Sequence, residues 1–132
     1  MQSRVLDSYA LIAFFEDEPG AEIVEALLLK AEENAIELAI SVVNLGEVWY
    51  SIARKTSPSI ADDYLRDIHG MAIEVVEADW ELTKLASSFK LKGKISYAGC
   101  FAAALAKNRK ADLVTGDKEF KSVEGEIKIS WI

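Results

Sequence analysis

Short apolar runs alternate along this chain with longer segments in which apolar residues recur every three or four positions. The short runs have the length and composition of buried parallel strands. They cover Val5–Leu6, Ile36–Ile40, Ile73–Val76 and Asp112–Thr115. Near the C-terminus, Ile127, Ile129 and Trp131 alternate with polar residues, which is typical of an edge strand with one wet face.

The segments between these runs have the apolar spacing of amphipathic helices. Their apolar stripes span Ile23–Ala31, Leu45–Ile52, Ile60–Ile68, Leu82–Phe89 and Ala98–Leu105, and a further short helix begins near Ser8. Alternating strands and helices predict a three-layer α/β/α sandwich around a central, mostly parallel sheet. A length of 132 residues suits one domain, which we expect to cover residues 1–132.

Composition excludes several classes of protein. Hydrophobic residues make up 51% of the chain, yet no apolar run reaches the roughly 18 residues of a membrane span. The N-terminus lacks the pattern of a signal peptide, and the single cysteine, Cys100, permits no internal disulfide. The only histidine, His69, leaves neither a Ser-His-Asp triad nor a histidine-rich metal set. We therefore expect a cytoplasmic protein with no membrane partner.

Three acidic residues follow strand-like runs and are candidates for a common site. Asp7 and Asp117 each lie just past an apolar run, and Glu47 lies in the helical segment that follows the second run. Loops at the carboxyl ends of parallel strands share one crevice, so these three carboxylates should converge there. Because like charges repel, such a cluster usually holds a hard cation such as Mg²⁺ or Mn²⁺.

Each of the three acids also has a plainer interpretation. Asp7 and Asp117 stand at strand-to-helix junctions, where a carboxylate caps free backbone N–H groups. Glu47 falls nearly opposite the apolar stripe of its own helix, so it can be an ordinary solvated residue or face a polar cleft beside Asn44. The shared placement of the three acids favours the metal site.

The net charge of −7 is unevenly distributed. Residues 1–80 carry a net charge of −11, whereas residues 81–121 carry +5. The basic stretch surrounds two of the candidate site segments and could attract a phosphate backbone. Its lysines include Lys92, Lys94 and Lys118, which are candidates for binding such a nucleic-acid backbone, although single lysines are commonly just solvated helix ends.

Four segments together resemble the PIN domain family and, within it, the VapC-type toxins of prokaryotic toxin–antitoxin pairs. They are Val5–Ser8, Asn44–Val48, Ser96–Ala106 and Val114–Phe120. The segments are individually short, but their order, spacing and strand–helix context make the match specific, and the resemblance covers nearly the whole chain.

The resemblance implies a metal-dependent endoribonuclease that hydrolyses RNA phosphodiester bonds. The family's acidic cluster corresponds to Asp7, Glu47 and Asp117, which would be both catalytic residues and ligands of Mg²⁺ or Mn²⁺. The resemblance also implies accessory residues. Ser8 and Thr115 would contribute hydroxyl groups to metal-bound water, Asn44 would steady Glu47, and Glu119 would be an accessory carboxylate. The implied partners are an RNA substrate, a VapB-type antitoxin and a second copy in a homodimer.

Gly99 departs from the family pattern, which usually has a metal-binding aspartate at this position. A glycine cannot coordinate through a side chain, and no acid lies within four residues on either side of it. We therefore expect weaker metal binding and reduced activity. The alternative is a catalytically inactive module that keeps antitoxin or RNA binding. A receiver-like phosphoacceptor domain would need an acid pair beside its first strand and a lysine after its last. It is disfavoured because the last strand here runs out to Ile132.

Overall fold

The computed structural model describes residues 1–132, which form one five-stranded sheet flanked by helices. The strands are β1 (Ser3–Leu6), β2 (Glu37–Ser41), β3 (Ile73–Val76), β4 (Asp112–Thr115) and β5 (Ile129–Trp131). The helices are α1 (Ser8–Phe15), α2 (Ala21–Glu32), α3 (Val42–Lys55), α4 (Pro58–His69), α5 (Trp80–Lys92) and α6 (Tyr97–Arg109), with a 3₁₀ helix, η1 (Lys118–Val123). The expected strands and helices are confirmed, with small shifts at their ends.

The sheet has the strand order β3-β2-β1-β4-β5, and every neighbouring pair is parallel. The expected mostly parallel sheet is therefore parallel throughout, including the C-terminal edge strand. The first strand lies at the centre, between β2 and β4. The chain first builds outward through β2 and β3 and then returns to the other side of β1 with β4 and β5.

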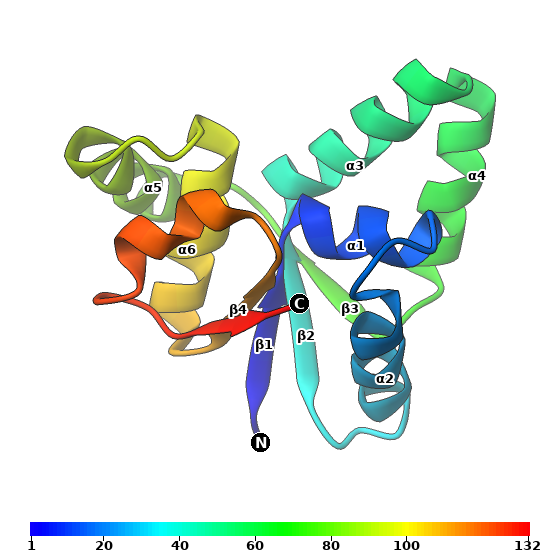
Figure 1. Ribbon diagram of the computed structural model, residues 1–132, viewed down its shortest axis with the longest axis horizontal. Helices are drawn as coiled ribbons and strands as arrows, with labels where there is room; N and C mark the ends of the chain where they lie inside the picture. The colour runs from blue at the N-terminus through cyan, green and yellow to red at the C-terminus, as the bar shows by residue number, and fades with distance from the viewer.

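Helices cover both faces of the sheet, which gives the three expected layers (Figure 1). Helices α5 and α6 and the 3₁₀ helix η1 lie on one face, and α1 to α4 lie on the other. Successive strand residues point to opposite faces. Val5 and Leu113 accordingly pack with the first group, and their neighbours Leu6 and Val114 pack with the second. Two apolar cores therefore share the sheet, which explains why the strands read as continuous apolar runs.

Several helices begin directly after a strand, on a side chain that caps the helix. Asp7 accepts a hydrogen bond from the backbone of Ala10 at the start of α1, and Ser41 caps α3 in the same way. At the opposite end of the chain, Asp117 caps η1. Asp7 and Asp117 are therefore helix caps, as their plainer interpretation predicted. Both residues also lie at the carboxyl ends of strands, so they can have a second role there.

The helix faces are less completely covered than their apolar stripes suggest. Ile23 of α2 and Ile60 of α4 are exposed, whereas Leu27, Tyr64 and Leu65 are half-buried against the core. No helix is both long and apolar enough to cross a membrane.

Candidate active site

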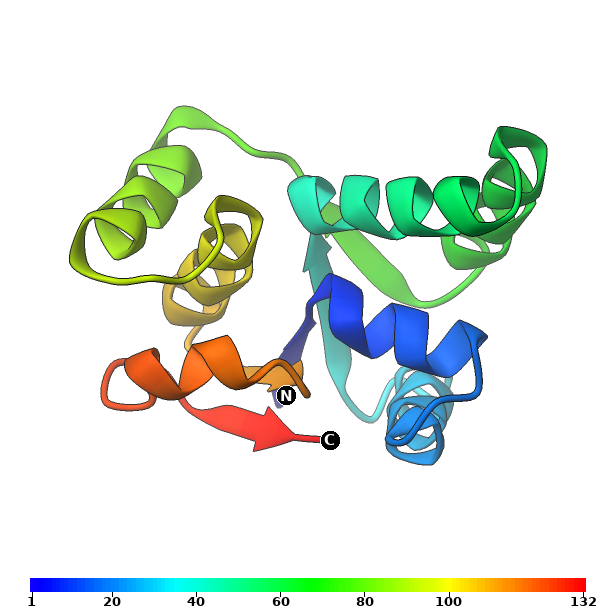
Figure 2. The same ribbon diagram turned by 45° about the horizontal axis from the view of Figure 1, so that its top comes forward.

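A small polar pocket lies at the carboxyl ends of the central strands, at the point where the strand order reverses. Helices α1, α3 and α6 all begin near this end of the sheet (Figures 1 and 2). The pocket is lined by Asp7, Ser8, Asn44, Glu47, Ser96, Gly99, Asp117, Glu119 and Phe120. Open parallel sheets bind ligands at this reversal. The three predicted metal-site acids thus line one pocket together with Glu119, and no Lys or Arg lines it.

Asp7 is the most buried acid of the pocket, with 4% of its surface exposed. Its Oδ1 accepts from the Ala10 backbone N–H at 3.0 Å, and its Oδ2 accepts from the Thr115 hydroxyl at 2.5 Å. Burial raises the pKa of Asp7 to about 7, an effect that the two hydrogen bonds oppose and the charges of Asp117 and Glu47 reinforce. The pocket therefore disfavours a negative charge at Asp7 unless a cation compensates for it.

Thr115 connects Asp7 to Asp117. The Thr115 side chain is fully buried, and its Oγ1 also accepts from the Asp117 backbone N–H at 3.0 Å. Asp117 Oδ1 in turn accepts from the Glu119 backbone N–H at 3.0 Å. One hydroxyl thus joins the Asp7 carboxylate to the backbone of Asp117, although the two residues are far apart in the sequence.

Asn44 holds Glu47 and contacts the helix that carries Gly99. Its Nδ2 donates to Glu47 Oε1 and to the Ala98 carbonyl, each at 3.0 Å. Asn44 is 1% exposed, and its Oδ1 is buried without a hydrogen-bond partner. An unpaired buried acceptor is costly, and this one belongs to a residue that lines the pocket.

Glu119 enters the pocket beside Gly99. Its Oε1 accepts from the Ser96 backbone N–H at 2.9 Å and from the Ser96 hydroxyl at 3.1 Å. Burial is the main cause that raises the pKa of Glu119, and the charge of Asp117 adds to it. A carboxylate at this place lies at the N-terminus of α6, where free N–H groups favour a negative charge.

The donor set suits a hard cation, although the side chains are not arranged as a finished coordination sphere. No group of three or more His, Cys, Asp or Glu side chains is placed to hold a metal ion as it stands. Each carboxylate instead accepts a hydrogen bond from its own surroundings. Carboxylate and amide oxygens are nevertheless the ligands that Mg²⁺ and Mn²⁺ prefer. The all-oxygen pocket and the unpaired Asn44 Oδ1 therefore fit such an ion.

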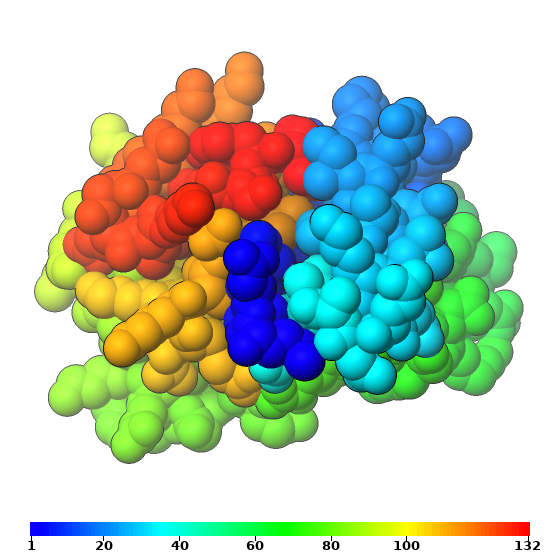
Figure 3. Space-filling view, turned by 90° about the horizontal axis from the view of Figure 1, so that it is seen from below, coloured from blue at the N-terminus to red at the C-terminus, as the bar shows by residue number.

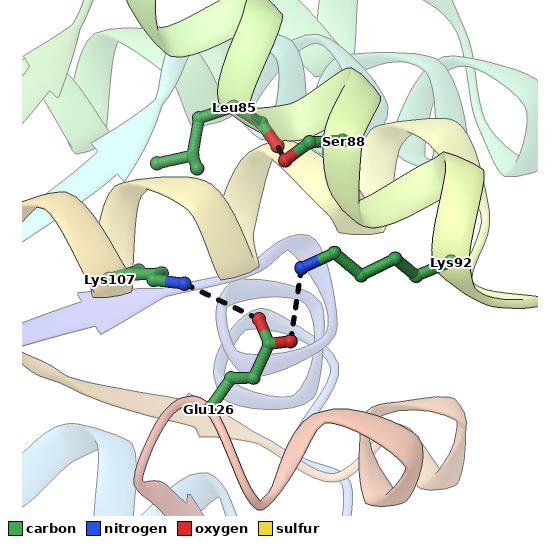
Figure 4. Close-up of polar contacts among 5 residues, drawn as sticks. All are labelled: Leu85, Ser88, Lys92, Lys107 and Glu126. Carbon is green, nitrogen blue, oxygen red and sulfur yellow. Dashed lines mark hydrogen bonds and ion pairs between the residues drawn. The ribbon is translucent and has the colours of Figure 1, made fainter.

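The three candidate RNA-binding lysines lie outside the pocket lining. Lys92 pairs with Glu126 at 3.2 Å, and Lys107 reaches the same carboxylate from α6 (Figure 4). Lys94 and Lys118 are exposed and have no ion pair. Lys118 directly follows Asp117, so it is the nearest of the three in sequence to a pocket acid.

A larger hollow lies at the opposite, amino end of the sheet, which is the face seen in Figure 3. Its volume is about 200 Å³, against about 30 Å³ for the acidic pocket. Arg109 and Glu74 line it and form an ion pair with each other at 2.9 Å. None of the predicted site residues lines this hollow, so size alone does not mark the site.

Two pocket residues were not predicted from the sequence. Ser96 caps α6 through the Gly99 backbone N–H and also binds Glu119. A serine directly before an apolar helical segment is a recognisable cap signal, which could have identified it. Phe120 is 1% exposed and anchors η1 in the core. No local signal distinguishes it from any other core aromatic.

Gly99 and Gly46 are both helical glycines, and we expect opposite effects of alanine at these two positions. Gly46→Ala adds a Cβ with no neighbour within 4 Å and should stabilise the protein by about 0.5–1 kcal/mol. At Gly99 an added Cβ would meet Glu119 Oε1 at 2.6 Å and Ile95 Cγ2 at 2.8 Å. Gly99→Ala should therefore destabilise the protein by about 1–3 kcal/mol. Thermal unfolding of both variants measures the difference, and a stabilised Gly99→Ala variant would contradict the observed packing.

The fold and the sequence both connect this chain to a known family. The profile of the PIN domain family matches residues 4–126, and the chain belongs to that family. A comparison with curated protein sequences finds no match.

Similar solved structures include VapBC2 from Rickettsia felis bound to a DNA fragment from their promoter, with 22% identity and a TM-score of 0.74 over 99% of this chain and 100% of that one. DNA-bound VapBC from Salmonella typhimurium has 18% identity and a TM-score of 0.77 over 98% of each chain. Mycobacterium tuberculosis VapC20, a sarcin–ricin loop cleaving toxin, has 12% identity and a TM-score of 0.72 over 91% of this chain and 94% of that one. At these identities the likeness concerns the fold.

Proposed function

We propose that this protein is a metal-dependent endoribonuclease of the VapC toxin type, with activity lowered by Gly99. The observation that carries the proposal is the pocket at the strand-order reversal, which four acids line without a basic residue. Membership of the PIN domain family and the fold shared with a sarcin–ricin loop cleaving toxin support the same function.

Asp7, Glu47 and Asp117 would hold Mg²⁺ or Mn²⁺ in this pocket, with Glu119 as an accessory carboxylate. A bound ion of this kind supplies an activated water and relieves the negative charge that develops on the phosphate and leaving oxygens. Asp7 is already fixed by Thr115 and by the start of α1. Asn44 donates a hydrogen bond to the Glu47 carboxylate, and Ser8 adds a hydroxyl to the lining of the pocket.

The RNA backbone would approach across a mixed surface. Lys118 and Lys94 are exposed and free of ion pairs, so both side chains are available for contacts with phosphates. Lys92 would have to leave Glu126 to do so, which makes it the weakest of the three candidates. Surface lysines of this kind mainly add affinity that decreases with salt.

A VapB-type antitoxin and a second copy of the chain are the proposed protein partners. Solved structures with this fold include VapBC complexes from two bacteria. The exposed apolar side chains available for such contacts include Ile23, Leu29, Tyr50, Ile60 and Trp80. Light scattering at high micromolar concentration should give the mass of a dimer, and a monomer alone would contradict the homodimer.

The nuclease function can be tested by RNA cleavage with Mn²⁺ or Mg²⁺ present or removed by a chelator. Cleavage of a panel of structured RNAs should require the ion and should be lost in Asp7→Asn and Asp117→Asn. Glu25→Gln makes a similar change in charge on the exposed face of α2 and serves as the matched control. Metal binding and RNA binding without any cleavage would favour the alternative, a binding module that has lost catalysis because residue 99 has no carboxylate.

A further inference from the structure

The space next to Gly99 is occupied by a side chain from another part of the chain. A Cβ built on Gly99 would have Glu119 Oε1 as its nearest neighbour, at 2.6 Å. That distance is shorter than any normal contact, so a side chain at residue 99 and the present Glu119 conformation exclude each other. Glu119 thus places a carboxylate oxygen where a side chain of residue 99 would begin.

The position of Glu119 is held by several contacts. The Ser96 backbone and hydroxyl both donate to Oε1, at 2.9 and 3.1 Å. The backbone N–H of Glu119 donates to Asp117, and the next residue, Phe120, is buried in the core. Both ends of the Glu119 side chain are therefore anchored, one in η1 and the other at the start of α6.

A second observation at the same turn of α6 points to a ligand. The Ala98 carbonyl accepts from Asn44, whose own Oδ1 is buried without a partner. This unpaired oxygen and the Glu119 carboxylate belong to residues that line the same pocket, as Gly99 does. A cation in the pocket would satisfy the free acceptor and neutralise the gathered carboxylates.

We propose that Glu119 replaces the side chain missing at residue 99, so that Asp7, Glu47, Asp117 and Glu119 together form the cation site of this chain. The inference rests on the proposed function and specifies its ligand set. Glu119 becomes a principal ligand, and Gly99 is required because it leaves room for the Glu119 carboxylate. The cation-binding carboxylate beside α6 can then come either from an aspartate at residue 99 or from a glutamate at residue 119.

Mn²⁺ binding, measured by titration calorimetry on the full chain, tests this exchange without relying on activity. Loss of a residue that merely supports a metal ligand typically weakens metal binding by about 10- to 100-fold. Glu119→Gln and Glu119→Ala remove a proposed ligand itself, so each should weaken Mn²⁺ binding by at least about 10-fold. The double variant Gly99→Asp/Glu119→Gln should restore it, because the aspartate introduced at residue 99 supplies the carboxylate directly and the neutral glutamine at residue 119 can turn away. Glu25→Gln should bind like the wild type. Circular dichroism melts establish that each variant is folded.

The possible outcomes separate this inference from the proposed function. If Asp7→Asn abolishes Mn²⁺ binding while both Glu119 variants bind like the wild type, Glu119 is not a ligand and the inference is wrong, whereas the proposed function stands. The inference also fails if the folded double variant binds no better than Glu119→Gln. If the wild-type chain binds no Mn²⁺ at all, the proposed function and the inference are both overturned.

Discussion

Asp7→Asn should make the metal-free protein more stable at pH 8, by up to about 4 kcal/mol. The pKa of Asp7 rises from 3.8 to about 7 on folding, chiefly because the carboxyl group is buried. Each pKa unit corresponds to about 1.4 kcal/mol. An asparagine at this position can still accept from the Ala10 backbone and can donate to Thr115, so the variant loses the buried charge while it keeps the cap.

The stability gain of Asp7→Asn should depend on pH in a defined direction. Below pH 4 Asp7 is protonated in both the folded and the unfolded state, so the two proteins should differ little. As the pH rises from about 4 to 7, the unfolded chain releases this proton more readily than the folded chain, and wild-type stability decreases. Above pH 7 the difference should be constant, because Asp7 is then ionised in both states.

Urea unfolding of both proteins across pH 4–8, with a chelator present, measures the difference between their free energies of unfolding. Glu25→Gln is the control and should show no such divergence from the wild type. A gap between wild type and Asp7→Asn that is the same at pH 4 and pH 8 would contradict the raised pKa. Adding Mn²⁺ at pH 8 should stabilise the wild type and leave Asp7→Asn unchanged, because only the charged side chain favours the ion.

The second large effect is expected for Gly99→Asp, which should destabilise the metal-free protein by about 2–4 kcal/mol. Crowding against Glu119 and Ile95 costs about 1–3 kcal/mol, and repulsion between neighbouring carboxylates adds up to about 4 kcal/mol for a pair 4 Å apart at an effective dielectric of about 20. Two smaller effects oppose this loss. Removing a helical glycine gains about 0.5–1 kcal/mol, and an acid near a helix N-terminus gains about 0.3–1 kcal/mol.

Mn²⁺ should recover more stability in Gly99→Asp than the substitution removes, since it neutralises the added carboxylate. Metal-dependent RNA cleavage should also increase, because an aspartate has one rotatable bond fewer than a glutamate and is attached directly to α6, whereas Glu119 is held beside α6 only through its hydrogen bonds to Ser96. The control is Gly99→Asn, which has nearly the same shape without the charge. Equal stability of the Asp and Asn variants with and without Mn²⁺ would show that crowding alone, and no cation, accounts for the effect.

Much of the fold follows from local patterns in the sequence. Apolar runs with a strand's length and stripes with a helix's period identify the elements, because each element has to bury its own apolar side. The same patterns put Asp7 and Asp117 past the ends of strands, and both residues do lie at the carboxyl edge of the sheet. These inferences depend only on residues close together in the chain.

Such patterns do not predict contacts between segments that are distant in the sequence. The pairing of Lys92 with Glu126 and the large pKa shift of Asp7 both depend on which elements pack together. Gly99 is the clearest example, because in the sequence it is simply a missing carboxylate with no acid nearby. In the folded protein Glu119 reaches the same place from η1.

The sequence by itself therefore determined the elements, the parallel sheet and the edge at which the acids gather. Only the tertiary structure decided that β1 lies between β2 and β4, which brings Thr115 against Asp7, and that Glu119 fills the space beside Gly99. The physical reason is that each helix or strand has to bury its own apolar side, which requires a periodic pattern of apolar residues within that element. A contact between two side chains from distant elements depends on how those elements pack together, and requires no such pattern in the sequence.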